Sequence, residues 1–509
     1  MNPAQPVAEA VAIRGARIIK VGTNQEIRQL IGKETKILRL KGKTVLPGFI
    51  DTHIHVLDFG KLSSWLDLAK VRSIDELQDN VRRRVEKSAR GDWILGRGWN
   101  EMRFTEKRLP NRLDLDEFSP ENPVVLYHEI KQVCLVNSRT LELAGINLKT
   151  PILSDCSIER DAETCEPTGI LRNSATDLVW HKIPEPSEKE LLEATAHACE
   201  KIVEAGVTSV HWLVLCVAEL SIAQKLHFQK RLPFRVNLIV PIDFIDDLYG
   251  FNSGDKSVLR VGGAVIVTDG YLASKTAALD NPYSDGLNSS GHLLTTPEEL
   301  YKMIEKVTKA GLQLIIHAVG DKAVGMALTA VERAQNLVTI MNTPVRIEQA
   351  AVLNEKLIEQ MKRHKVIVSV QPLVISSEFS MWHALEHLGT QRARWLFPLK
   401  TMLRNSIRVI AGSDCPMEPL NPLLGIQAAV TRKDFPEEQV KVEEILRMYT
   451  IDAAYSSGEE TLKGSIEEGK LADLTVVSQD PTTVPPIALS KIDVELTIIN
   501  GQIEYSKFS

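Results

Sequence analysis

The chain has 509 residues, of which 44% are hydrophobic and 25% charged, and its formal net charge is −6. This composition is typical of a globular enzyme and argues against a disordered chain. It also argues against a nucleic-acid-binding protein, which would need a basic surface. The length predicts two to four domains, or one large α/β barrel with additions.

The sequence shows no targeting or membrane signal. No basic stretch leads into an apolar run at the N-terminus, as a secretory signal peptide would require. The longest apolar stretch, 213–218, ends at Glu219 and is far shorter than the ~18 residues of a membrane span. The six cysteines form no CxxC pair. We expect a cytoplasmic protein that binds a small-molecule substrate and has no nucleic-acid or membrane partner. A homodimer is compatible with the sequence.

Both ends of the chain carry short strand-like patterns. Residues 11–22 (VAIRGARIIKVG) and 36–46 (KILRLKGKTVL) read as strands punctuated by glycines. Residues 471–480 and 494–506 near the C-terminus have the same character. We therefore expect one small β domain that is built from both chain ends.

The middle of the chain alternates apolar runs with helical periodicity. Helical patterns such as 188–206 and 296–311 end in glycine, a common C-terminal stop. The eight runs are LPGFIDTHIH (46–55), GVTSVHWL (206–213), FRVNLIV (234–240), AVIVTDG (264–270), LQLIIHAV (312–319), VRIEQAAV (345–352), VIVSVQP (366–372) and IRVIAGSD (407–414). This alternation predicts a parallel (β/α)8 TIM barrel. The first two runs are about 150 residues apart, which predicts a long insertion after strand 1. A doubly wound open sheet is the alternative, but it would usually show a glycine-rich phosphate turn.

Four residues at strand ends form a candidate metal site. His53 and His55 are two positions apart on the first predicted strand, so both imidazoles project to the same side. His317 ends the fifth strand and Asp414 ends the eighth. Active sites of such barrels are built at these carboxyl ends of the strands. Three imidazoles and a carboxylate suit a hydrolytic zinc ion and leave room for water.

Further residues are candidates for substrate binding because they lie at strand ends, in the insertion or in a predicted lid. The lid is the segment 376–404, which follows strand seven. An amphipathic helix packed on the barrel is an equally good interpretation of that segment. The candidates are His211 and Trp212 at the end of strand two, Gln371 at the end of strand seven, Trp99 and Asn100 in the insertion, and Arg394 in the lid segment.

Taken together, several motifs resemble the amidohydrolase superfamily, and within it the family 3 group that includes N-substituted formamide deformylase. They are KTVLPGFIDTHIHV, GDWILGRGWNE, LVNSRTLELAGI, EPTGILRNSA, TDGYLASKTAAL, IIHAVGDKAV, VRIEQA, VSVQP, AGSDCPMEPLNPL and KGSIEEGKLADLTVV. The resemblance covers nearly the whole chain. It implies a metal-dependent barrel at 48–464, with an insertion at about 60–185, and a composite β-sandwich from 1–47 and 465–509.

The chain departs from the family pattern at three positions. Val265 stands where the family usually has a lysine whose carbamate could bridge two metals, and Gln349 stands where it usually has a histidine. A further histidine expected before the VNS motif is replaced around Gln132. A two-metal site would thus lack its bridge and a ligand. We predict one divalent metal ion, with zinc as the expected ion, held by His53, His55, His317 and Asp414; iron, cobalt, nickel or manganese could occupy such a site.

The resemblance implies hydrolysis of a C–N bond in an amide, formamide or related non-peptide substrate. Asp414 would move the proton of the attacking water, and Gln349 would hydrogen-bond the developing oxyanion. Asp321 belongs to the family pattern HAxGD and is a substrate-binding candidate, although a turn carboxylate is the simpler interpretation. Two alternatives stay open: a deaminase, cyclic-amide hydrolase or decarboxylase on the same site, and a degenerate barrel that only binds.

Overall fold

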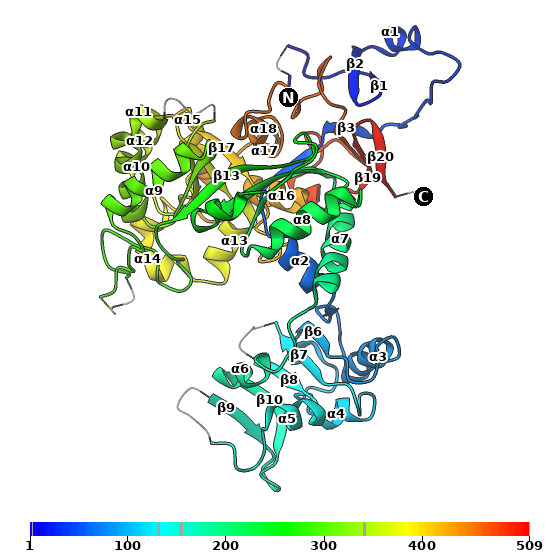
Figure 1. The fold of residues 1–509 in the computed structure, drawn as a ribbon, viewed down its shortest axis with the longest axis vertical. Coiled ribbons are helices and arrows are strands. Elements are labelled where there is room, and N and C mark those ends of the chain that lie inside the picture. Colours follow the sequence, from blue (N-terminus) through cyan, green and yellow to red (C-terminus); the bar gives the residue numbers. More distant parts are fainter. Residues whose placement is uncertain are drawn as a thin grey trace. The chain divides into compact units, whose positions relative to one another are not determined.

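The computed structural model describes residues 1–2, 4–129, 133–151, 156–284, 286, 288–338 and 343–507 (Figure 1). Contacts within the chain divide it into two compact units. The first comprises residues 1–59 and 195–509, and the second comprises residues 60–194. Each unit is described by itself.

The first unit contains an eight-stranded parallel sheet that confirms the predicted barrel. The strands occur in chain order around the sheet, and each of the eight predicted apolar runs supplies one of them. They are β4 (Phe49–Ile54), β11 (Val207–Leu213), β12 (Arg235–Pro241), β13 (Leu259–Val267), β14 (Gln313–Ala318), β15 (Arg346–Gln349), β16 (Ile367–Val370) and β17 (Arg408–Ala411).

The last and first strands meet at their carboxyl ends. The amide of Asp414 donates to the carbonyl oxygen of His53 at 2.8 Å, and the amide of His55 donates to Cys415 at 2.9 Å. A parallel bridge also joins Ile54 to Cys415. These contacts bring the end of β4 against the segment that follows β17.

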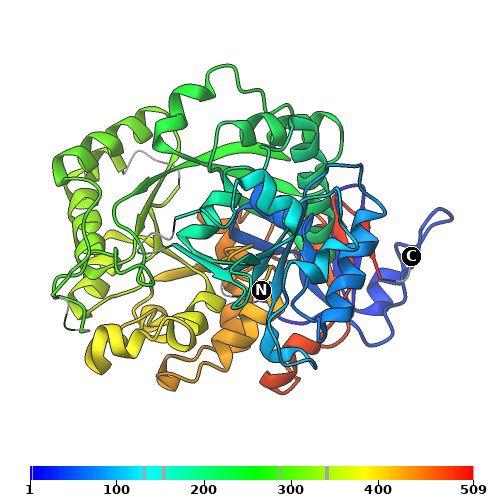
Figure 2. The same cartoon turned by 90° about the horizontal axis from the view of Figure 1, so that it is seen from below.

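Helices run around the outside of the barrel strands (Figure 2). Helix α9 shows how the sequence defines them: Thr296 and Glu299 form a capping box at its start, and Pro297 occupies its first turn. The elements around the barrel are α2 (Val56–Ser63), α7 (Glu188–Glu204), α8 (Ala218–Phe228), η3 (Ile242–Leu248), α9 (Pro297–Lys309), α10 (Asp321–Arg333), α11 (Gln335–Val338), α12 (Glu355–His364), α13 (Pro372–Ser380), α14 (Ala384–Ala393), α15 (Leu399–Arg404), α16 (Pro422–Val430), η4 (Pro436–Glu438), α17 (Val442–Met448) and α18 (Ile451–Ser456).

Strands from both chain ends share one antiparallel sheet, in the order β20-β19-β18-β3. These are β3 (Thr44–Pro47), β18 (Leu474–Val477), β19 (Val494–Ile499) and β20 (Gln502–Ser506), with η5 (Pro486–Lys491) before β19. The hairpin β1 (Ala10–Arg14) and β2 (Arg17–Gly22) packs on it through Ile18, and α1 (Asn24–Arg28) follows. The predicted strand at 36–46 forms only from Thr44 onward, and the preceding Ile37 and Leu38 are exposed. The domain limits given above stay a prediction.

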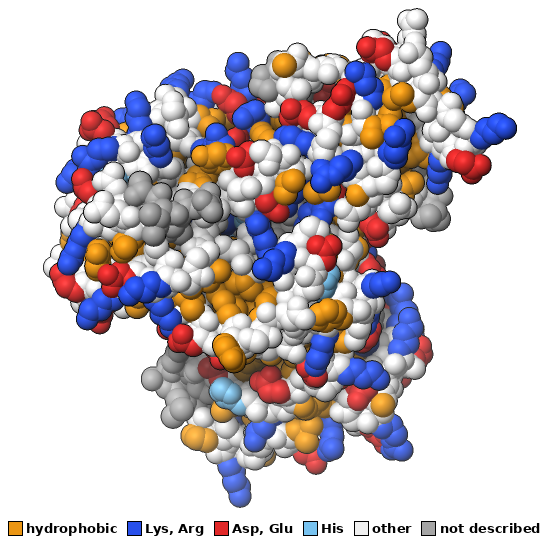
Figure 3. Space-filling model, turned by 45° about the horizontal axis from the view of Figure 1, so that its top comes forward, with side chains coloured by type: hydrophobic (Ala, Val, Ile, Leu, Met, Phe, Trp, Pro, Cys, Tyr) orange, Lys and Arg blue, Asp and Glu red, His pale blue; other side chains and the backbone are white. Residues whose placement is uncertain are grey.

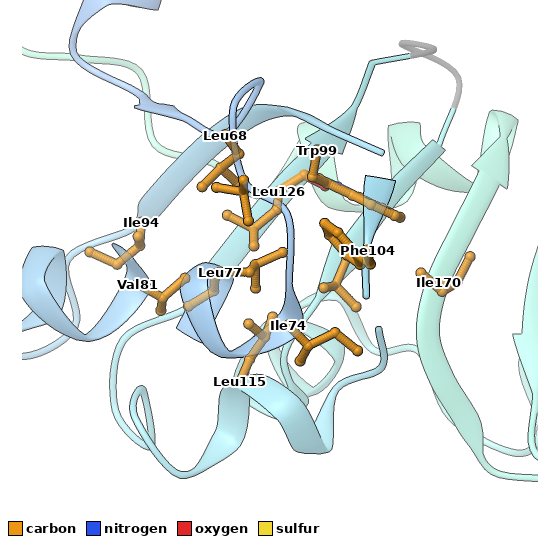
Figure 4. Packing of buried hydrophobic residues seen from close by; sticks show 13 residues of the cluster. Leu68, Ile74, Leu77, Val81, Ile94, Trp99, Phe104, Leu115, Leu126 and Ile170 are labelled. Carbon is orange, nitrogen blue, oxygen red and sulfur yellow. The ribbon is translucent and has the colours of Figure 1, made fainter. Parts of the chain in front are cut away.

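The second unit, residues 60–194, has a six-stranded mixed sheet in the order β5-β6-β7-β8-β10-β9. Its main core packs helix α3 (Ile74–Val85) against the sheet through residues such as Leu77, Trp99 and Leu126 (Figure 4). The strands are β5 (Leu66–Asp67), β6 (Ile94–Trp99), β7 (Val124–His128), β8 (Val133–Val136), β9 (Cys156–Arg160) and β10 (Pro167–Asn173). The helices are α3 (Ile74–Val85), η1 (Glu101–Arg103), α4 (Leu113–Asp116), α5 (Ser138–Ala144), η2 (Ser174–Thr176) and α6 (Asp177–Trp180). The unit thus has its own hydrophobic core.

Within the described ranges, no helix combines the length and the apolar character needed to cross a bilayer. On the face shown in Figure 3, acidic and basic side chains are interspersed.

Candidate functional site

Two histidines lie at the carboxyl end of a fully buried strand: His53 is in β4, and His55 directly follows it. Every residue of Phe49–Ile54 is buried, and His53 is 5% exposed. The rings of His53 and His55 are 5.5 Å apart between centroids and nearly perpendicular. The strand geometry therefore presents both imidazoles to the same place, as the spacing predicts.

Asp414 approaches these histidines from the segment that follows β17, which lies against the end of β4. Its backbone lies in the left-handed region, with φ of 60°, a conformation that non-glycine residues rarely adopt. The Nε2 atoms of His53 and His55 each lie 3.5 Å from Asp414 Oδ1. Ligand atoms of the three residues all lie within 4.8 Å of one another. The left-handed turn thus aims the carboxylate at both imidazoles.

This arrangement fits a metal ion. Ligands about 2.1 Å from a tetrahedral ion lie roughly 3.4 Å apart, close to the two observed nitrogen–oxygen separations. Two imidazoles and a carboxylate are also the donors that a hydrolytic divalent ion uses. His53, His55 and Asp414 could therefore hold one divalent ion.

His317 is not part of this three-residue group but lies at the same end of the barrel. It is buried near the end of β14, and its Nε2 atom has no hydrogen-bond partner among the described residues. Burial lowers the pKa of His317 to about 4, and His53 contributes to the decrease while Glu348 and Asp414 oppose it. The imidazole is therefore neutral near pH 7 and electrostatically coupled to the two predicted ligands.

An ion pair under the site was not identified from the sequence. Nδ1 of His53 lies 2.8 Å from Glu348 Oε2, and Glu348 forms a salt bridge with Arg346. Burial alone would raise the pKa of Glu348, but Arg346 and His53 outweigh it and hold that pKa at about 2. Burial would also lower the pKa of His53, yet the nearby Glu348 carboxylate raises it. One signal was available in the sequence. Arg346 and Glu348 are two residues apart on the predicted sixth strand, so their side chains were expected on the same face.

A second missed residue is Asp269, in the loop after β13. Its carboxylate accepts three backbone hydrogen bonds of 2.9 Å, from Ala278, Val319 and Gly320. Burial raises the pKa of Asp269 to about 6, although these bonds act against the rise. Because Val319 follows Ala318 and His317 directly, Asp269 fixes the backbone that carries His317.

The structure shows the surroundings of two of the three positions at which the chain departs from the family pattern, Val265 and Gln349. Val265 packs in an apolar cluster with Leu213, Ile239 and Ile315. Gln349 ends β15 in the left-handed region, with φ of 70°, and is buried. Gln132 lies outside the described residues.

Two of the predicted substrate-binding residues lie near the end of β11. Trp212 is fully buried, and its indole donates to Glu219 Oε2 at 2.5 Å. His211 is also fully buried and accepts at Nδ1 from Arg346 at 2.9 Å. Burial, with Arg346 nearby, lowers the pKa of His211 well below its usual value. His211 is thus a neutral imidazole that contacts Arg346.

The other candidates on the barrel differ in exposure. Gln371, which precedes α13, is fully buried, and neither polar atom of its side chain has a partner among the described residues. Asp321 begins α10 and accepts from the amides of Asp280 and Lys322. The predicted lid segment is largely helical, in α13, α14 and α15, and Arg394 is exposed at the end of α14. Gln371 therefore has the least satisfied polar side chain of these candidates.

The remaining two candidates lie in the second unit. Trp99 is fully buried in the core of that unit, where its indole donates to the carbonyl oxygen of Leu126 at 2.8 Å. Asn100 caps η1 by accepting from the amide of Met102, and it donates to Glu129 at 2.7 Å. Both side chains have partners within their own unit.

Comparison with known proteins identifies the family. Residues 36–505 match the model of the amidohydrolase family. The chain belongs to this family. The chain is 32% identical to the putative amidohydrolase YtcJ of Bacillus subtilis (strain 168), over 98% of this chain and 96% of the relative. It is 28% identical to N-substituted formamide deformylase of Arthrobacter pascens, over 98% and 95% of the two chains.

Solved structures agree with this assignment. The crystal structure of an uncharacterized metal-dependent hydrolase from Pyrococcus furiosus has a TM-score of 0.74 and 31% identity, covering 93% of this chain and 95% of that chain. A second such hydrolase, from Pyrococcus horikoshii, has the same TM-score. By its family and its fold, the chain is therefore a metal-dependent hydrolase with a barrel.

Proposed function

We propose that the protein hydrolyses a C–N bond in an amide, formamide or related non-peptide substrate, using one metal ion held by His53, His55, His317 and Asp414. The observation that carries this proposal is the 3.5 Å approach of two imidazole nitrogens to Asp414 Oδ1 at the mouth of the barrel. The relative named N-substituted formamide deformylase supports the substrate class.

The residues that stand in place of the ligands of a second metal ion support a single-ion site. Val265 is an apolar packing residue, and an amide such as that of Gln349 is a poor zinc ligand beside an imidazole. Zinc is the proposed ion, because imidazole and carboxylate donors suit it. When bound, such an ion supplies Lewis acidity, which activates water and polarises a carbonyl group.

The protein side chains then have separate roles in the proposed reaction. Asp414 takes the proton of the attacking water and delivers it to the leaving nitrogen. The Gln349 amide donates to the oxyanion that develops on the substrate carbonyl. Gln371 is the proposed polar contact for substrate, because its buried amide has no partner among the described residues. Substrate contacts by Trp99, Asn100, His211, Trp212, Asp321 and Arg394 stay predictions, as do the cytoplasmic location and a homodimer.

The experiment that tests the proposal has two steps. Metal content per chain is measured by elemental mass spectrometry on protein purified without added metal or chelator, with His53→Ala as the comparison. The loaded protein is then assayed on N-substituted formamides, simple amides, cyclic amides and heterocyclic amines. About one ion and release of amine from an amide or formamide are expected. Release of ammonia from a heterocyclic amine would favour a deaminase instead, and no binding of zinc, manganese or iron would exclude the metal mechanism.

Substitutions separate the two catalytic roles. Asp414→Asn is expected to lower kcat by about 100-fold or more at saturating metal, because general acid–base catalysis contributes on this scale. Gln349→Ala removes the oxyanion donor and Gln349→His changes it. Unchanged rates in both Gln349 variants would contradict its proposed role.

A further inference from the structure

A buried ion pair lies on the same face of one barrel strand. Arg346 and Glu348 are two residues apart on β15, so their side chains project to the same side. Arg346 is completely buried and Glu348 is 1% exposed, and the two form a salt bridge. Removing two charges from water is costly, so a pair at this depth needs further partners to be tolerated.

Arg346 is fixed by three other barrel strands. Its guanidinium donates to the carbonyl oxygen of Thr52 at 2.6 Å, to Ser369 Oγ at 3.2 Å and to His211 Nδ1 at 2.9 Å. These partners belong to β4, β16 and β11. Because a guanidinium is planar and carries its donors in fixed directions, these contacts hold it in one orientation against Glu348.

Glu348 in turn contacts a predicted metal ligand. Its Oε2 atom lies 2.8 Å from Nδ1 of His53. A carboxylate paired with arginine can only accept a hydrogen bond, so Nδ1 carries a hydrogen; in the neutral imidazole the other ring nitrogen then keeps its lone pair. That other nitrogen, Nε2, is the atom 3.5 Å from Asp414 Oδ1.

We propose that Arg346 and Glu348 are positioning residues that fix the tautomer and the ring orientation of His53, so that Nε2 is presented to the metal. This inference rests on the proposed role of His53 as a ligand. Carboxylates that orient metal-bound histidines in this way are a general feature of metal sites, and their loss typically weakens metal binding 10–100-fold.

The neighbouring histidine has no such partner. Nδ1 of His55 is buried and has no hydrogen-bond partner among the described residues. The ion pair therefore acts on His53 and not on His55. This asymmetry provides an internal comparison for the test.

The test measures the zinc affinity of the purified full chain by competition with a chromogenic chelator, without substrate. Glu348→Gln keeps the size of the side chain but removes its charge, and it is expected to weaken zinc binding by about 10–100-fold. The same factor is expected in a His55→Ala background and little further loss in a His53→Ala background, because residues that act as a unit are not additive. An equal further loss in the His53→Ala background would overturn the proposal.

Two further variants separate positioning from folding. Glu348→Gln leaves the Arg346 charge buried alone, so Arg346→Met/Glu348→Gln, which removes both charges, is measured beside it. This double variant is expected to fold, as judged by circular dichroism, and to show the same loss of zinc affinity; binding as tight as in the unmodified protein would overturn the proposal.

Glu459→Gln is the matched control, since it neutralises another carboxylate, one that pairs with Lys463 and Arg260. An equal loss of affinity in this control would also overturn it.

A direct readout of the imidazole does not depend on any Glu348 variant. In metal-free protein labelled with 15N-histidine and held at pH 9, the His53 signal, assigned by its loss in His53→Gln, is expected to show the Nδ1–H tautomer. The Nε2–H tautomer would contradict the proposal.

Since no substrate is used, failure of the unmodified protein to bind any divalent ion would count against the proposed function, whereas normal binding by every Glu348 variant would count only against this inference.

Discussion

The backbone amide of Asp414 donates a 2.8 Å hydrogen bond to the carbonyl oxygen of His53. A proposed ligand of the first barrel strand and one from the segment after the last strand are therefore joined through the main chain, and their side chains also approach each other. A metal ion bound by both would hold the two strands together where the barrel closes. Metal binding and folding stability should be linked at this point.

We therefore expect metal removal to lower the thermal unfolding midpoint. A ligand that binds only the folded state stabilises it by about 2.7 kcal/mol at 100 times its dissociation constant. Differential scanning fluorimetry before and after chelation, and after zinc is restored, measures the shift. His55→Ala is the control and should show a much smaller response. Equal midpoints with and without metal would contradict the link.

Val265→Lys tests the apolar setting that replaces the second metal site. The substitution puts an amine among Leu213, Ile239 and Ile315, and we expect it to destabilise the protein by several kcal/mol without raising the metal content above one. Urea unfolding and elemental analysis measure the two effects. Val267→Lys is the matched control, because this residue of the same strand is 48% exposed. A stable Val265→Lys protein with two ions would show that a second site can still form.

Asp269→Ala tests whether the loop that follows His317 is fixed by one carboxylate. The substitution leaves the amides of Ala278, Val319 and Gly320 without their acceptor. Each unsatisfied buried donor costs about 1–3 kcal/mol, so we expect about 3 kcal/mol or more of lost stability, together with weaker zinc binding. Asp280→Ala, an exposed position, is the control. Full stability in Asp269→Ala would exclude this role.

We expect the buried carboxyl group of Glu378 to make the stability of the protein depend on pH. Burial raises the pKa of this carboxyl group from 4.5 to about 8 in the folded protein. Between these two values the folded state keeps a proton that the unfolded state has lost, so the group lowers stability progressively as the pH rises from about 4.5 to 8.

Glu378→Gln removes that titration. The variant should match the unmodified protein near pH 4 and exceed its stability by a few kcal/mol near pH 9, as measured by unfolding at both pH values. Glu386→Gln, on the exposed surface of α14, should show no such difference. A constant offset between the Glu378→Gln variant and the unmodified protein at all pH values would rule out titration as the cause.

The barrel could be predicted because its strands are buried on both faces and read as continuous apolar runs. The residues at the ends of β4 and β17 could also be predicted, because side-chain alternation along a strand is enough to place His53 beside His55. The expected strand at 36–43 was wrong, because Ile37 and Leu38 find no partner strand and stay exposed. Apolar alternation predicts a strand only where another strand is available to pair with it.

The contacts beneath the site could not be derived from spacing. Glu348 contacts His53 across 295 positions of sequence, and the choice of partner depends on how the strands are staggered around the barrel. Trp212 illustrates the same limit: the sequence places it at a strand end, but only the structure shows that its indole donates to Glu219. Pattern identifies the strand end, while register decides what each side chain touches.

The closing seam between β4 and the residues after β17 also sets an order of events during synthesis. His53 and His55 leave the ribosome first, and Asp414 and the segment that pairs with β4 follow only about 360 positions later. The three-residue group therefore cannot form on a short nascent chain.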